Sequence, residues 1–77
     1  MRPFKYLTIP ERAHPLVREL FRRMRFQRVS VNMLSDRSGL KADTIRRWRD
    51  LNNPRVPDLE ACLNVVNCEL RVVKRYE

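Results

Sequence analysis

The chain contains a single glycine, Gly39, and this residue constrains the fold more than any other feature of the sequence. It lies between two short segments, 31–38 and 42–50, that each carry apolar residues at helical spacing. A lone glycine in this place suits the left-handed conformation that ends a helix, where a Cβ is strained. Ser30 is suited to cap the first segment, because its hydroxyl can accept a backbone N–H. We therefore predict two short helices joined by a tight turn. Their apolar positions are Val31, Leu34, Ile45 and Trp48.

Apolar residues recur at helical spacing in two further segments, one on each side of this pair. The first starts at His14-Pro15, with proline in the first turn, and ends near Phe26. The second opens at Pro57-Asp58, and Asn67 suits a left-handed stop. The repeating positions are Val17, Leu20, Phe21 and Met24, then Leu59, Cys62, Leu63 and Val66. The predicted fold class is therefore mainly α, with four helices.

The two ends of the chain differ from this helical pattern. Residues 1–13 contain two prolines and alternate weakly, so they are predicted to form an extended arm or a short edge strand. Leu70 to Val73 is rich in β-branched residues and bounded by charge, which predicts one short C-terminal strand that needs a partner. The predicted organisation is an arm at 1–13, a four-helix domain at 14–67, and a strand with a tail at 68–77.

Positive charge dominates the composition. The formal net charge is +8 with a pI near 10.8, and 14 of the 17 basic residues are arginine. Such a field attracts polyanions, either nucleic acid or an anionic membrane surface. Arginine is suited to bidentate contacts with guanine or phosphate, so nucleic acid is favoured. Because 77 residues bury only a small core, dimerisation is a plausible source of further stability.

Several functional classes find no support in the sequence. The two cysteines have no partner pair or clustered histidines, so no metal site is predicted. With one histidine and no paired nucleophile and base, no enzyme activity and no cofactor are expected. No membrane span or signal peptide is recognisable, which predicts a cytoplasmic protein with free thiols. Cys62 is assigned to the core, while Cys68 is left open between packing and a thiol sensor.

One recognisable pattern runs through the segment from Val17 to Val73: Leu34-Ser35, Gly39, Thr44-Ile45, Arg47-Trp48 and Pro57-Asp58-Leu59-Glu60. With this pattern the segment, roughly three-quarters of the chain, resembles a Cro/C1-type (XRE-like) helix-turn-helix repressor domain. The tail Glu69-Leu70-Arg71-Val72-Val73 is similar to members of that family that end in a dimer-forming strand. Three positions depart from the family's pattern: Val31 replaces the usual glutamine, Lys41 the usual serine cap, and Arg49 the usual acidic residue that pairs with the first helix.

The resemblance implies a transcriptional regulator, a repressor, that binds double-stranded DNA as a homodimer on an inverted repeat, with the 42–50 helix in the major groove. The small size implies autoregulation of the phage, controller or mobile-element type, bacterial or phage-encoded, with no small-molecule ligand. The implied base contacts are Ala42, Asp43, Arg46 and Arg47. The phosphate contacts expected are Arg28, Ser30, Lys41, Thr44 and Arg55.

Other interpretations of the basic residues stay open. A protein-interaction module, such as an antitoxin or antiactivator, would use the basic face on an acidic partner. The cluster Arg46-Arg47-Arg49 favours functional contact, and Trp48 is assigned to packing.

The Arg22-Arg23-Arg25 run fits a solvated helix face as well as a backbone contact or partner surface. The arm either enters a minor groove through Arg2 and Lys5 or pairs residues 4–8 with the C-terminal strand. A third possibility is that residues 17–24 bind a membrane surface as a basic amphipathic helix. The apolar residues of this segment are, however, needed to close the core.

Overall fold

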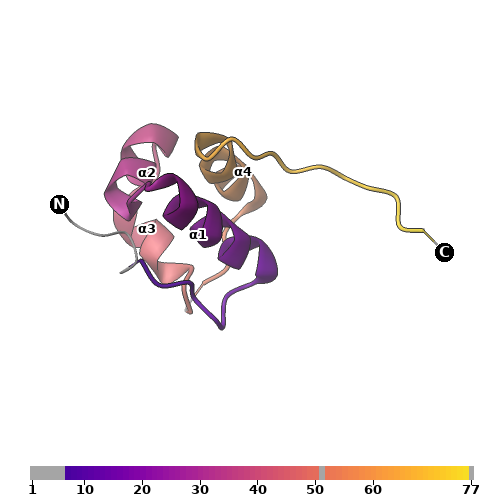
Figure 1. The fold of residues 1–77 in the computed structure, drawn as a ribbon, viewed down its shortest axis with the longest axis horizontal. Helices are drawn as coiled ribbons and strands as arrows, with labels where there is room; N and C mark the ends of the chain where they lie inside the picture. Colours follow the sequence, from indigo (N-terminus) through magenta and orange to yellow (C-terminus); the bar gives the residue numbers. More distant parts are fainter. Residues whose placement is uncertain (1–6, 51, 77) are drawn as a thin grey trace.

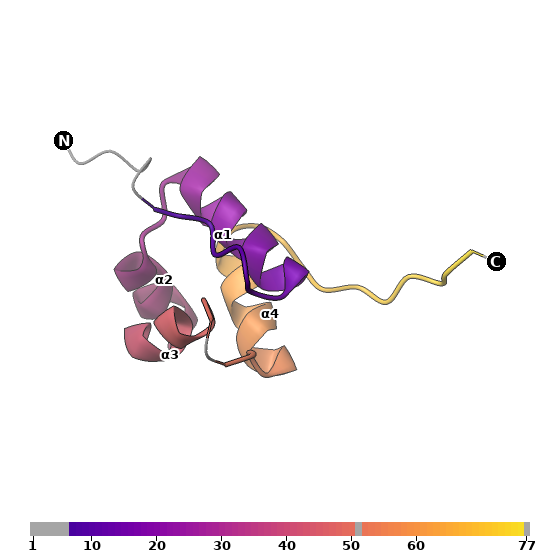
Figure 2. The same cartoon turned by 90° about the horizontal axis from the view of Figure 1, so that it is seen from below.

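The computed structural model describes residues 7–50 and 52–76 and contains four helices in that part of the chain. These are α1 (Pro15–Gln27), α2 (Val31–Ser38), α3 (Ala42–Arg47) and α4 (Val56–Val65). Helix α2 packs against both α3 and α4, and α1 also contacts α4, so the helices enclose one core (Figures 1 and 2). The predicted domain of four helices is confirmed, and the described residues form an all-α fold. No helix in the described ranges has the length and apolar character needed to cross a membrane.

His14 and Ser30 lie at the predicted starts of α1 and α2, and each caps its helix. The backbone N–H of Leu16 donates to Nδ1 of His14 at 3.0 Å, and Pro15 follows in the first turn of α1. At the start of α2 the backbone N–H of Met33 donates to Oγ of Ser30 at 3.1 Å. Each bond satisfies an amide that the helix itself leaves without a partner. The Ser30 cap and the helix start at His14-Pro15 confirm the sequence prediction, and the two bonds fix where the helices begin.

The turn between α2 and α3 is built around Gly39, whose φ is +84°. Its N–H donates to the Ser35 carbonyl at 3.0 Å, which closes the last turn of α2. The Ser35 hydroxyl then donates to the Leu40 carbonyl at 2.5 Å. The left-handed end predicted from the lone glycine is confirmed, and α3 follows after three residues, 39 to 41.

We predict that Gly39→Ala lowers the free energy of unfolding by about 1–2 kcal/mol, the cost of a left-handed conformation for a residue with a Cβ. An added Cβ would meet no atom within 4 Å, so the cost comes from the backbone alone. Urea denaturation followed by circular dichroism measures it. Gly39→Asn is the matched control and should lose less, because asparagine tolerates this conformation. Equal stability of Gly39→Ala and the parent would contradict the assignment.

The core is formed by buried residues from all four helices and from the connections beside them. Phe21, Leu20 and Met24 of α1 are fully buried, and Trp48 is 3% exposed directly after α3. The packing role predicted for Trp48 is therefore confirmed. Among residues 7–50 and 52–76, the buried hydrophobic residues of the core are Val17, Leu20, Phe21, Met24, Val29, Leu34, Ile45, Trp48, Leu59, Cys62, Leu63 and Val66.

Two helix boundaries differ from the prediction. Helix α3 ends at Arg47 instead of continuing to Asp50. The N–H of Trp48 bonds the Ile45 carbonyl at 3.1 Å and that of Arg49 bonds the Arg46 carbonyl at 3.2 Å, so the chain tightens into three-residue turns. Helix α4 begins at Val56, one residue before the predicted Pro57.

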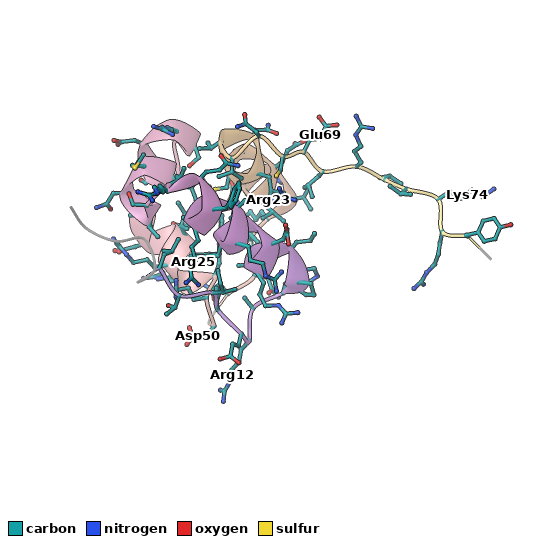
Figure 3. The ribbon with its side chains drawn as sticks, viewed as in Figure 1. Arg12, Arg23, Arg25, Asp50, Glu69 and Lys74 are labelled. Carbon is teal, nitrogen blue, oxygen red and sulfur yellow. The ribbon has the colours of Figure 1, made fainter. Side chains whose placement is uncertain are left out.

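The predicted C-terminal strand is absent from the described residues. After α4 the chain turns at Asn67, whose φ of +63° confirms the predicted left-handed stop. Leu70 is still partly buried against the core, whereas residues 71–76 project away from the helices and Lys74 lies far from the body (Figures 1 and 3). A strand requires a neighbouring strand to receive its hydrogen bonds, and the described part of this single chain provides none. Val72 and Tyr76 are consequently fully exposed, at 103% and 98%.

The N-terminal arm also forms no strand in its described part, residues 7–13. Pro10 is buried, and Leu7, Ile9 and Ala13 are partly buried against the core. The predicted pairing of residues 4–8 with the C-terminal strand falls mainly on residues 1–6, which lie outside the described residues, as do Arg2 and Lys5. Within the described arm, Thr8 contacts Arg49 instead.

Candidate nucleic-acid interface

One side of α3 presents an exposed acidic and basic pair that reaches across to α2. Nη1 of Arg46 donates to Oδ1 of Asp43 at 3.2 Å, and its Nη2 donates to Oδ1 of Asn32 at 3.3 Å. The side chains of Arg46 and Asp43 are 51% and 83% exposed, so both remain accessible to a ligand. The structure thus brings together two of the predicted base contacts and places the second residue of α2 beside them.

The other side of α3 borders an open depression of about 330 Å³ between α3 and the start of α4. It contains three of the predicted DNA contacts: Arg47, which was assigned to a base, and Thr44 and Arg55, which were assigned to phosphates. Arg46 and Arg47 therefore lie on different sides of α3, although they are neighbours in the sequence. The lining residues are Thr44, Arg47, Trp48, Asn52, Asn53, Arg55 and Asp58.

The remaining predicted contacts lie at the starts of α2 and α3. Lys41 is exposed at the N-cap of α3 and makes no side-chain capping bond, and Ala42 is the first, half-buried residue of that helix. Arg28 closes α1 in a left-handed conformation, two residues before the capping Ser30. Because Asn32 contacts Arg46, the start of α2 lies next to the exposed face of α3.

Sequence reasoning missed three asparagines at this surface. Asn32 accepts from Arg46, while Asn52 and Asn53 line the depression. One property of the sequence could have indicated them. Asparagine side chains both donate and accept hydrogen bonds, so asparagines near the predicted arginine contacts are candidates to contact DNA as well.

Arg49 does not join Arg46 and Arg47 on the exposed face of α3. Its Nη2 donates to the Thr8 carbonyl at 2.9 Å and also contacts the Thr8 hydroxyl. Its guanidinium carbon lies 5.0 Å from the centre of the Phe21 ring, within the range of a cation–π contact. Arg49 is half-buried and faces the arm and α1.

The basic run on α1 is partly occupied by internal ion pairs. The carboxylate of Glu19 accepts a hydrogen bond from Nε of Arg23 at 2.9 Å and another from Nη1 of Arg22 at 3.2 Å. The hydrogen bond from Arg23, helped by that from Arg22, lowers the pKa of Glu19. All three side chains are about half exposed, so each pair adds little to stability. This arrangement suits a solvated helix face for Arg22 and Arg23.

The thiol of Cys62 is buried in the core, and burial raises its pKa to about 11. We predict that iodoacetamide at pH 8 labels Cys68, which is half-buried, well before Cys62 in the folded protein, because the thiolate is the reactive species. Mass spectrometry of timed samples measures the order. Labelling in denaturant is the control and should remove the difference. Faster labelling of Cys62 would contradict its place in the core.

No group of three or more histidine, cysteine, aspartate or glutamate side chains able to hold a metal ion occurs within residues 7–50 and 52–76. Comparison with known proteins found no match: no family model, no curated protein and no solved structure is significantly similar to this chain.

Proposed function

We propose that this protein is a sequence-specific DNA-binding transcriptional regulator of the helix-turn-helix kind, similar to Cro/C1-type repressors. It acts as a homodimer on an inverted repeat, with α3 in the major groove and half-sites about 34–36 Å apart. The observation that carries the proposal is the exposed surface of α3. It presents Arg46 on one side and Arg47 on the other, and α2 supports it across a three-residue turn.

The chemistry of α3 fits the edges of base pairs. Arginine can donate two hydrogen bonds to O6 and N7 of guanine, and Asp43 can accept from N4 of cytosine. Ala42, at the start of the helix, suits contact with a thymine methyl. The bonds from Arg46 to Asp43 and Asn32 hold its guanidinium beside the helix in the free protein. Such support reduces the side-chain freedom that must be lost on binding.

The phosphate contacts are assigned to the groups that flank α3. In the depression, Thr44, Arg47 and Arg55 combine a hydroxyl with two guanidinium groups, and Asn52 and Asn53 add amides. Such groups fix the register of a protein on the duplex without reading its sequence. Arg47 borders both the reading face and this depression, so we keep it as a base contact and place Thr44 and Arg55 on the backbone. Lys41, Ser30 and Arg28 complete the set on the α2 side.

The homodimer is proposed to form through the projecting tail. A strand centred on Val72 in antiparallel pairing places Glu69 opposite Arg75 of the second copy, and such opposite charges stabilise cross-strand pairs. Shifting the centre toward Val73 would instead set Arg71 against Lys74 or Arg75, which is unfavourable. Charge therefore selects the register centred on Val72. The exposed valines of the tail would be covered in the dimer.

Salt dependence tests the proposed backbone contacts. We predict that Arg55→Ala weakens binding to any duplex and reduces the slope of log affinity against log salt by about one per protomer, because one phosphate contact is lost. Fluorescence anisotropy with a labelled duplex at several salt concentrations measures the slope. Arg37→Ala removes an exposed arginine from the last turn of α2, outside the proposed contacts, and is the control. Equal slopes for Arg55→Ala and the parent would remove Arg55 from the interface.

A second candidate function is the binding of an acidic protein partner, as in an antitoxin or antiactivator. The observation that favours it is Phe26, which is 84% exposed at the end of α1 next to Arg25. Aromatic and arginine side chains are enriched at protein interfaces. Loss of partner binding in Phe26→Ala, with DNA binding unchanged, would support this function beside the first.

A further inference from the structure

We propose that Arg49 is a positioning residue for DNA reading. Its contacts hold the N-terminal arm against α1 and the turn after α3, and so fix the orientation of α3; we call this set of contacts the clasp. This inference rests on the proposed function, because it concerns how the reading helix is held. It assigns to Arg49 a role distinct from those of Arg46 and Arg47, which face the ligand.

The contacts of Arg49 join three segments that are distant in the sequence. The guanidinium donates to the backbone carbonyl of Thr8 and contacts its hydroxyl, which ties the arm to residue 49. The same guanidinium lies over the ring of Phe21, which is fully buried in α1. The backbone of Arg49 belongs to the turn that closes α3, through its bond to the Arg46 carbonyl. One side chain therefore connects the arm, α1 and the end of α3.

The arm is packed at the place where Arg49 holds it. Pro10 is buried beside partly buried Ile9. Ile9, Pro10, Glu11 and Arg12 border a surface hollow of about 210 Å³ together with Arg49 and Asp50. Figure 3 shows Arg12 and Asp50 at the same end of the molecule, where the arm passes the chain that leaves α3. The hydrogen bonds to Thr8 add a directional tie to this apolar packing.

Helix α3 needs such external support because it has only six residues. Helices of this length owe their stability to tertiary packing, and groups that read a ligand must be held within about 0.5 Å of their productive position. Ile45 and Trp48 anchor the inner side of α3 and its following turn in the core. Arg49 adds a second anchor directly after Trp48, so its loss should shift or loosen α3 without emptying the core.

A direct phosphate contact is the competing role for Arg49, and salt dependence separates the two. Loss of a phosphate contact reduces the slope of log affinity against log salt by about one per protomer. Loss of a positioning residue lowers the preference for the specific sequence and leaves that slope unchanged. Arg49→Lys keeps the charge but lacks the planar guanidinium that stacks on Phe21 while its Nη2 contacts Thr8. Arg49→Met keeps an unbranched chain over Phe21 and removes both charge and donors.

The experiment compares the parent, Arg49→Lys and Arg49→Met in two measurements, after circular dichroism has established that each is folded. The first, without DNA, is the rate of cleavage after the exposed Glu11 by a glutamate-specific protease. We expect about ten- to a hundredfold faster cleavage in Arg49→Met, in proportion to the lost bonds to a charged group, and an intermediate rate in Arg49→Lys. The second measurement is affinity for a selected duplex and for a scrambled duplex, at several salt concentrations.

The proposal expects both variants to lose preference for the selected duplex by about tenfold while the salt slope stays at the parent value. Parent-like cleavage in Arg49→Met would overturn the clasp. Faster cleavage with unchanged sequence preference would overturn the link between Arg49 and DNA reading. A slope reduced by about one per protomer in Arg49→Met, with parent-like behaviour in Arg49→Lys, would also overturn that link. If the parent prefers no duplex, the proposed function fails and the positioning role fails with it, while the cleavage rates still report on the clasp separately.

Discussion

Replacing Phe21 by alanine is expected to lower the free energy of unfolding by about 3–5 kcal/mol, the usual cost of removing a large aromatic side chain from a core. Phe21 is fully buried on α1 and its ring also lies beneath the Arg49 guanidinium. A single core of this size rarely supplies more than about 3–5 kcal/mol in total. We therefore expect Phe21→Ala to be largely unfolded at 25 °C.

Phe26→Ala is the matched control for this prediction, because it makes the same chemical change on the same helix at a side chain that is 84% exposed. Its effect should stay within about 0.5 kcal/mol. Thermal and urea unfolding followed by circular dichroism give both values. A cost for Phe26→Ala as large as that for Phe21→Ala would mean that the two faces of α1 are wrongly assigned.

Arg46→Ala and Arg47→Ala are each expected to reduce discrimination between the preferred sequence and a random duplex by about 1–3 kcal/mol, or roughly 5- to 150-fold. Each side chain is proposed to contact a base, and alanine removes the two hydrogen bonds that the guanidinium would donate to it. The loss should concentrate at one base-pair position for each variant, because the two side chains leave α3 on different sides. Affinity for single-base variants of the preferred site measures this directly.

The charge-matched controls are Arg46→Lys and Arg47→Lys, which keep the electrostatic attraction and lose the planar fork. Lysine should preserve affinity for random DNA better than alanine while still reducing discrimination. If alanine weakens binding equally on every sequence, the arginine contacts phosphate and does not read bases. For Arg47, which also borders the depression with Arg55, that result would move it to the backbone contacts.

The parts of the fold that local sequence determines were predictable. Ser30 and His14 cap helices through bonds to residues only two or three positions away, and Gly39 ends α2 through its own φ. Buried residues such as Trp48 follow from helical spacing. The end of α3 was predicted too late, because three-residue bonds at Trp48 and Arg49 leave no trace in the apolar pattern.

The contacts that join distant segments were not predictable from this pattern. Arg49 looked like a third exposed arginine of the reading helix, but its partners are Thr8 and Phe21, which only the packing of the arm and α1 brings near. Asn32 likewise meets Arg46 only because α2 and α3 cross. The strand predicted at Leu70 to Val73 depends on hydrogen bonds from a neighbouring strand, which residue preference in one chain does not specify.

Selection from a pool of random duplex DNA, followed by sequencing, tests the central claim most directly. The parent, Arg46→Ala and Arg47→Ala would be compared at two salt concentrations, because nonspecific binding falls steeply with salt. We predict that the parent enriches an inverted repeat with half-sites about one helical turn apart, and that each variant loses the enrichment at a defined position. Uniform, salt-sensitive binding with no enriched sequence would contradict the account of this protein as a sequence-specific regulator.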